Sequence, residues 1–140
     1  MTRDEMLGLC RQWEDAFARR DLDALADLYS EHAVVESPMA GTVTGRETVV
    51  QAQHGMFAAF PDMTWTFEPP LVDGHRAAIV AEAAGTHAGI IMGLPPTGRA
   101  FRGRLVFLLD VEDHHIVRDR RIYDFTGLLV QVGVLKAKPA

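Results

Sequence analysis

The fold is decided by residues 99–128, which read RAFRGRLVFLLDVEDHHIVRDRRIYDFTGL. Over residues 101–110, one parity carries Phe101, Gly103, Leu105, Phe107 and Leu109, and the other carries Arg102, Arg104, Val106, Leu108 and Asp110. This is the period of a β-strand with one buried face. A second strand-like run follows the turn candidate at residues 112–115 and ends on a carboxylate, Asp124. The stretch therefore predicts a long β-hairpin.

The second arm of this hairpin carries charges on both of its faces. Strand parity places Arg118, Arg120 and Asp124 on one face, and Asp119 and Arg121 on the other. Neither face can then be an ordinary dry core, so we expect a concave sheet that lines a partly polar cavity. A carboxylate in the wall of such a cavity loses solvent, its pKa rises, and it can exchange protons near neutral pH.

Asp124 is the leading candidate for that acid. Two structural roles stay open for the same side chain, because it could cap a helix that starts at Thr126 or form an ion pair with Arg120. Ion-pair networks perturb carboxylates as catalytic sites do, so the residue pattern by itself does not choose between these roles.

Length and composition bound the class of protein. The chain has 140 residues, 48% of them hydrophobic, which indicates one domain (1–140) with a core large enough to leave a small pocket, followed by a loose tail at 136–140. A net charge of -5 and dispersed basic residues argue against a nucleic-acid partner. The single cysteine, Cys10, rules out a disulfide framework.

The sequence was also searched for membrane spans, a signal peptide and metal-ligand patterns. No apolar run reaches the length of a membrane span, and the N-terminus lacks the basic start and apolar core of a signal peptide. We therefore expect no membrane partner and a cytoplasmic location. His114 and His115 are adjacent and should point apart on a strand, so they are interpreted as solvated turn residues and no metal site is expected.

Three helices are predicted before the long strands. Residues 2–5 have the spacing of a capping box, and Asp21 starts a second, short helix. Residues 44–47 form another capping box, for a helix that runs to about Ala59. The proline in Phe60-Pro61-Asp62 should stop this helix.

Strands are predicted over residues 33–37, 63–67 and 76–87, in addition to the hairpin. In the long strand 76–87, one face carries the small residues Ala81 and Ala83, which should leave room for a cavity. His87 would stand at the end of that face as a proton donor or acceptor, or else at the surface. The order of elements predicts an α+β class, with helices packed on a curved antiparallel sheet.

Short motifs over nearly the whole chain resemble those of one family. They are Asp21-Leu22-Asp23-Ala24-Leu25, Gly45-Arg46-Glu47, Phe60-Pro61-Asp62, Gly85-Thr86-His87-Ala88-Gly89, the segment 93–99, Tyr123-Asp124 and the segment 127–133. The family is the SnoaL-like polyketide cyclases of the nuclear-transport-factor-2-like superfamily. The resemblance implies a cone-shaped fold, N-terminal helices over the concave face of the sheet, and a homodimer.

The resemblance also implies a chemistry. Asp124 would be the acid/base residue that removes a proton between two carbonyls, so that the enolate closes a ring by intramolecular aldol reaction without a cofactor. His87 would be the donor that offsets charge on an oxygen. The implied partner is a small hydrophobic or polyketide-like carbonyl compound. A non-catalytic binder of such a molecule, an isomerase or dehydratase of the same fold, and a docking module remain alternatives.

The predicted pocket lining around Asp124 and His87 combines aromatic and charged side chains: Trp13, Glu36, His54, Phe57, Trp65, Phe107 and Arg120. Several of these residues could instead lie outside the pocket. Trp13 and His54 could belong to the core, and Glu36 could face solvent.

Overall fold

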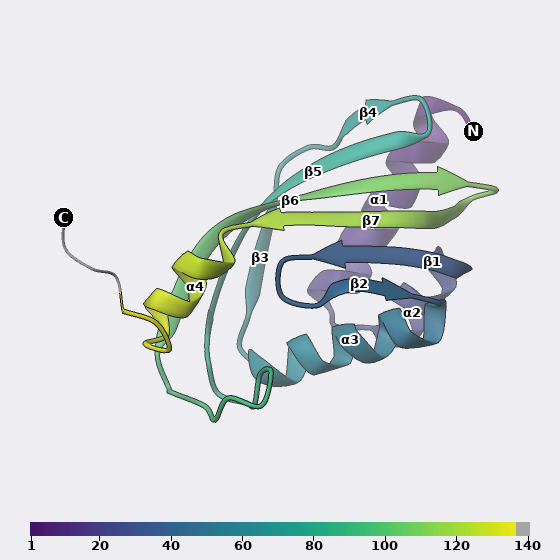
Figure 1. Cartoon of the computed structure of the whole chain (residues 1–140). Helices are drawn as coiled ribbons and strands as arrows, with labels where there is room; N and C mark the ends of the chain where they lie inside the picture. The colour runs from purple at the N-terminus through teal and green to yellow at the C-terminus, as the bar shows by residue number, and fades with distance from the viewer. Residues whose placement is uncertain (137–140) are drawn as a thin grey trace.

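The computed structural model describes residues 1–136, so the predicted loose tail at 136–140 lies outside the described residues beyond Lys136. Within this range the chain forms four helices and seven strands (Figure 1). The helices are α1 (Arg3–Ala18), α2 (Leu22–Leu28), α3 (Arg46–Ala59) and α4 (Phe125–Gln131). The strands are β1 (Tyr29–Ser37), β2 (Gly41–Thr44), β3 (Thr64–Phe67), β4 (Leu71–Asp73), β5 (Arg76–Thr86), β6 (Ala100–Glu112) and β7 (His115–Tyr123).

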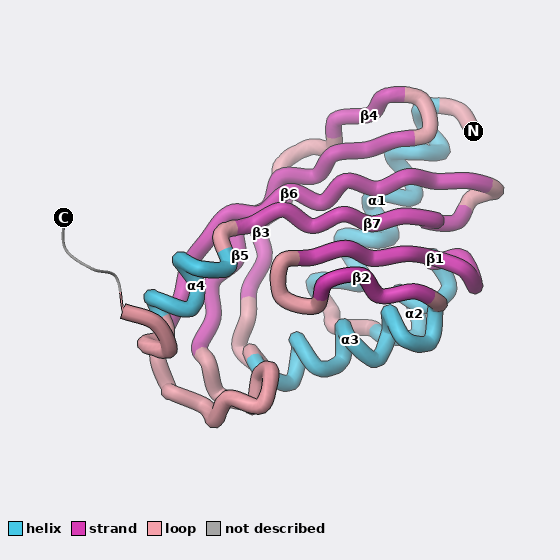
Figure 2. The backbone as a smooth tube through the Cα atoms, in the orientation of Figure 1, coloured by secondary structure: helices cyan, strands magenta, loops and turns pink. Residues whose placement is uncertain are grey.

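The strands form one curved sheet in the order β2-β1-β7-β6-β5-β3, with β4 also paired to β5 (Figure 2). The predicted hairpin is confirmed as β6 and β7, which pair from Leu105 opposite Tyr123 to Glu112 opposite His115. Its two turn residues, Asp113 and His114, have φ of 49° and 62°. Positive φ at both positions gives a two-residue turn the twist that its strands require.

The predicted α+β class with helices over a curved sheet is confirmed, and two details differ. β1 lies parallel to β7, with Val34 opposite Arg118, whereas the other strand pairs are antiparallel. Residues 41–44 form β2 at the edge of the sheet, a strand that was not among those predicted. Side-chain alternation fixes the faces of a strand and carries no information about the direction of its neighbour, which explains why the parallel pair was not predicted.

Helix α1 covers one face of the sheet, seen behind β6 and β7 in Figure 1. Its Trp13 ring packs edge-on against Phe107 of β6, at 4.8 Å between centroids. Two predicted caps are confirmed, since Thr2 accepts from the Glu5 amide and Asp21 from the Ala24 amide. The third is wrong: Gly45 caps α3 at φ 95°, without a side-chain hydrogen bond.

The inward charges of β7 belong to a buried cluster, here called the core polar network: Trp13, Tyr29, Gln53, Asp119 and Arg121. Asp119 Oδ2 accepts from the Tyr29 hydroxyl at 2.7 Å and from Arg121 Nη2 at 3.0 Å. Trp13 Nε1 donates to the Tyr29 oxygen at 3.0 Å, and Arg121 Nη1 donates to Gln53 Oε1 at 2.6 Å. Burial and the Asp119 charge raise the pKa of Tyr29, which keeps its phenol neutral.

No helix in residues 1–136 is long and apolar enough to cross a membrane. The cytoplasmic location stays a prediction.

Candidate active site

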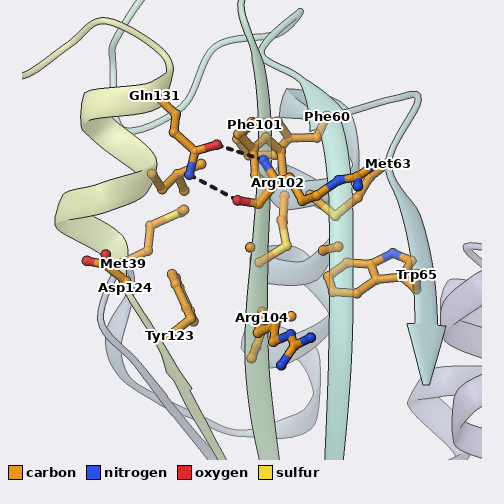
Figure 3. Close-up of a pocket in the computed structure, with 15 residues that line it drawn as sticks. Met39, Phe60, Met63, Trp65, Phe101, Arg102, Arg104, Tyr123, Asp124 and Gln131 are labelled. Atoms are coloured by element: carbon orange, nitrogen blue, oxygen red, sulfur yellow. Dashed lines mark hydrogen bonds between the residues drawn. The ribbon is translucent and has the colours of Figure 1, made fainter. Parts of the chain in front are cut away.

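A pocket of about 340 Å³ lies at the end of the sheet where β7 stops and α4 begins (Figure 3). Its walls come from β3, β5, β6, the end of β7, α3, α4 and the turn between β1 and β2. The lining is largely apolar: Met39, Met56, Phe60, Met63, Trp65, Ala83, Phe101, Arg102, Gly103, Arg104, Leu105, Tyr123, Asp124, Leu128 and Gln131. This volume suits a small organic molecule.

The hollow exists because small residues meet on adjacent strands. Ala83 of β5 stands opposite Gly103 of β6 and, on its other side, opposite Trp65 of β3. A β-carbon built on Gly103 would meet nothing within 4 Å. The prediction that small residues of the strand 76–87 leave volume is confirmed at Ala83.

Gln131 ties α4 to the sheet beside this hollow. Beyond Leu105, β6 has no further β7 residue to pair with, because β7 ends at Tyr123. The Gln131 amide takes the place of a neighbouring strand: Arg102 N donates to Oε1 at 2.8 Å, and Nε2 donates to the Arg102 carbonyl at 3.0 Å (Figure 3). The wall formed by α4 is therefore fixed to β6.

Asp124 lies at the mouth of the pocket and caps α4. Its Oδ1 accepts from the Gly127 amide at 2.8 Å, and a β-carbon at Gly127 would collide with the carboxylate. The helix starts one residue earlier than predicted, at Phe125. The expectation of a desolvated acid is wrong, because the Asp124 side chain is exposed at the mouth and not enclosed by the wall.

Tyr123 precedes Asp124 and lines the same pocket. Its hydroxyl is shielded from solvent and lies beside the Ser37 side chain and the Met39 backbone. Burial raises the pKa of this phenol above its ordinary value. Trp65 Nε1 is also shielded, and it is unpartnered within the described chain.

His87 does not reach the pocket, so that prediction is wrong. Its imidazole is fully buried, Nδ1 lies 3.1 Å from Thr97 Oγ1, and the ring packs beside Phe60, with 5.9 Å between centroids. Phe60 is the residue that lines the pocket. β5 ends at Thr86, so the strand alternation that placed His87 on the cavity face stops before it.

Among the other predicted pocket residues, Trp65 lines the pocket and the rest lie elsewhere. Trp13, Phe57 and Phe107 fill the core, where each packs against the Phe17 ring. Interlocked rings occupy the volume that the prediction assigned to a ligand. His54 is exposed on α3.

Two charged residues predicted for the pocket belong to the outer face of the sheet. Glu36 pairs with Arg118 at 3.2 Å, and Arg120 Nη2 lies 3.6 Å from Asp110. Arg120 therefore does not pair with Asp124. Both placements follow from parity, because Asp119 and Arg121 of β7 face inward.

Sequence reasoning missed most of the lining. They come from four separate segments, and no local pattern marks them as neighbours: Met39, Met56, Phe101, and Leu128 with Gln131 of α4. One signal was available for Tyr123, since it lies directly beside the candidate acid at the end of a strand.

The model of the SnoaL-like polyketide cyclase family matches residues 8–132. The chain belongs to this family. The nogalonic acid methyl ester cyclase of Streptomyces nogalater is 46% identical over 50 residues, which cover 35% of this chain and 37% of that enzyme. The matched stretch thus spans little more than a third of the curated relative.

Solved structures extend the likeness to nearly the full chain. IdmH of Streptomyces antibioticus, a candidate polyketide cyclase, is 32% identical at a TM-score of 0.75 and covers 90% of this chain and 96% of its own. AclR of Streptomyces galilaeus, a candidate hydroxylase, is 28% identical at a TM-score of 0.83, with coverage of 99% and 87%. A SnoaL-like protein from Jannaschia has a TM-score of 0.86 at 19% identity, which shows the fold alone.

Proposed function

We propose that this SnoaL-like protein is a cofactor-independent acid/base enzyme that acts on a small hydrophobic carbonyl compound, by intramolecular aldol cyclisation of a polyketide-like chain. One observation carries the proposal. Asp124 is the single carboxylate among the residues that line the largely apolar pocket. Family membership and the likeness to IdmH support a cyclase or isomerase of this fold.

The proposed reaction needs one group that moves a proton. The Asp124 carboxylate takes a proton from a carbon beside a carbonyl, and the electron pair of the C–H bond passes into an enolate. The enolate carbon attacks a second carbonyl of the same molecule. The alkoxide formed there recovers the proton from the Asp124 carboxylic acid, so that atoms and charges balance. The apolar walls hold the flexible chain in the reactive conformation.

A pocket-filling variant tests the site. Gly103→Leu places a side chain in the open space above Ala83, so we expect at least tenfold weaker binding of 2-tetralone, a bicyclic ketone that serves as a probe, with little loss of stability. Binding is measured by titrating 2-tetralone into the protein and recording tryptophan fluorescence, which responds through Trp65 in the pocket wall. Ala78→Leu, on the outer face of β5, is the matched control and should bind like the parent.

The same probe separates an enzyme from a binder. Proton NMR in D₂O shows whether the protein accelerates deuterium exchange at C1 of 2-tetralone, the carbon beside its carbonyl. Acceleration supports the enzyme. Unchanged affinity in Gly103→Leu would contradict the site, and tight binding without any acceleration would favour a ligand-binding module.

We further propose that two copies pair through the outer face of the sheet. Ile122 is 57% exposed there, close to the ion pairs Glu36–Arg118 and Arg120–Asp110. A face that carries both signs of charge around apolar side chains can complement a second copy of itself. Light scattering should give a dimer for the parent and a monomer for Ile122→Glu, and a monomeric parent would refute the pairing.

A further inference from the structure

A second, smaller hollow, here called the inner chamber, lies beside the candidate active site. Its volume is about 60 Å³, and its walls come from β1, β2, α3 and Arg121 of β7. Met39 and Met56 line both this chamber and the larger pocket, so the two methionines stand between them. One water-sized atom needs roughly 10–15 Å³, so the chamber has room for a group of a few heavy atoms.

Two buried polar side chains form part of the wall of the inner chamber. Gln53 is 5% exposed and Arg121 is 8% exposed. The Gln53 oxygen is well used, because Oε1 accepts from Arg121 Nη1 at 2.6 Å, whereas Nε2 donates only to the sulfur of Met56, at 3.9 Å. A thioether sulfur is a weak acceptor, and a buried amide gains from a better one. The Gln53 amide therefore points to an oxygen acceptor on a ligand that displaces Met56.

The charges around the chamber indicate that this acceptor is neutral. Arg121 is already balanced by Asp119, whose Oδ2 lies 3.0 Å from Nη2. A ligand carboxylate would give the buried cluster an uncompensated negative charge, which is costly away from water. A ketone or ester carbonyl accepts the same hydrogen bond without adding charge.

We propose that Met39 and Met56 move aside to admit one end of the substrate into the inner chamber, where a neutral carbonyl oxygen accepts a hydrogen bond from Gln53 Nε2. Methionine suits this part because its unbranched side chain has three rotatable bonds and repacks readily. The inference rests on the proposed function in taking the reacting carbon to lie at Asp124. It adds that the substrate carries a second carbonyl, remote from that carbon.

Three ketones that differ in one substituent test the chamber. They are 2-tetralone with an acetyl, an isopropyl or a carboxyl group at C6, on the ring away from the ketone. Acetyl and isopropyl have nearly the same shape, so the parent should bind the 6-acetyl ketone about tenfold more tightly, the usual contribution of one hydrogen bond. The 6-carboxyl ketone should bind more weakly than the 6-acetyl ketone. Tryptophan fluorescence titration measures all three affinities.

Gln53→Met removes the amide at nearly constant side-chain length. It should lower the affinity for the 6-acetyl ketone to that for the 6-isopropyl ketone. The stretch of a ¹³C-labelled acetyl carbonyl in the bound ketone should move to higher frequency in the infrared spectrum. Gln51→Met, at an exposed position of the same helix, is the matched control and should change neither the affinities nor the frequency.

A second variant tests the chamber without touching its hydrogen bonds, because Gln53→Met also takes an acceptor from Arg121 and lowers stability. Ala52→Leu fills the chamber from α3. It should weaken binding of the 6-acetyl and 6-isopropyl ketones at least tenfold and leave the affinity for unsubstituted 2-tetralone unchanged.

Four results would overturn the assignment: equal affinity of the parent for the 6-acetyl and 6-isopropyl ketones, tighter binding of the 6-carboxyl ketone, an acetyl frequency that Gln53→Met leaves unchanged, or unchanged affinities in Ala52→Leu. None of these readouts needs turnover. Binding of the acetyl group through Gln53 without deuterium exchange at C1 would therefore refute the proposed function alone.

Discussion

Asp124→Asn is expected to slow deuterium exchange at C1 of 2-tetralone by about 10²- to 10⁴-fold, the usual contribution of a general base. Asparagine caps a helix as well as aspartate does, so its side-chain oxygen can still accept from the Gly127 amide. The substitution therefore removes the base and keeps α4 in place. Proton NMR in D₂O measures the exchange, and thermal unfolding checks that stability is retained.

Asp21→Asn is the matched control for that experiment. Asp21 caps α2 in the same way, through a 3.0 Å hydrogen bond from the Ala24 amide, and does not line the pocket. This variant should exchange the ketone protons at the parental rate. Full activity in Asp124→Asn would show that Asp124 is a cap and that the base lies elsewhere.

Asp119→Ala is expected to lower the free energy of unfolding by about 3–5 kcal/mol, because it leaves the Arg121 guanidinium buried without its counter-charge. Arg121 is 8% exposed and cannot turn to solvent, and the Tyr29 hydroxyl loses its acceptor as well. Urea denaturation followed by circular dichroism measures the change.

The exposed ion pair Glu36–Arg118, on the outer face of the sheet, serves as the comparison for the buried pair Asp119–Arg121. Glu36→Ala breaks the 3.2 Å contact with the half-exposed Arg118, and we expect a cost of at most about 1 kcal/mol. If Asp119→Ala lowers the free energy of unfolding by no more than Glu36→Ala does, the core polar network is not a significant source of stability.

The elements with strong local patterns were predictable from the sequence. The β6–β7 hairpin follows from two-residue alternation on both sides of a short turn, and the helix starts at Thr2 and Asp21 follow from side chains that accept amide hydrogens. Charges on both faces of β7 correctly indicated a polar interior. The sequence alone did not show that Asp119 and Arg121 neutralise each other in the core, since their other partners, Tyr29 and Gln53, come from distant elements.

The candidate site was predictable only in part, for two physical reasons. A pocket is the space that packing leaves, so the aromatic residues that seemed suited to line it, Trp13 and Phe107, fill the core instead. Strand parity also fails where a strand ends, and His87 lies one residue past β5. Asp124 lines the pocket mouth as expected, yet its exposure and its role as a cap depend on α4, which follows it.

A crystal structure of Asp124→Asn with bound 2-tetralone tests the central claim most directly. The variant binds without turning over, so the complex shows where the ketone lies before proton transfer. We predict the ketone above Gly103 and Ala83, with C1 within about 3.5 Å of the residue 124 side chain. A ketone bound outside this pocket, or inside it with C1 turned away from residue 124, would contradict the account.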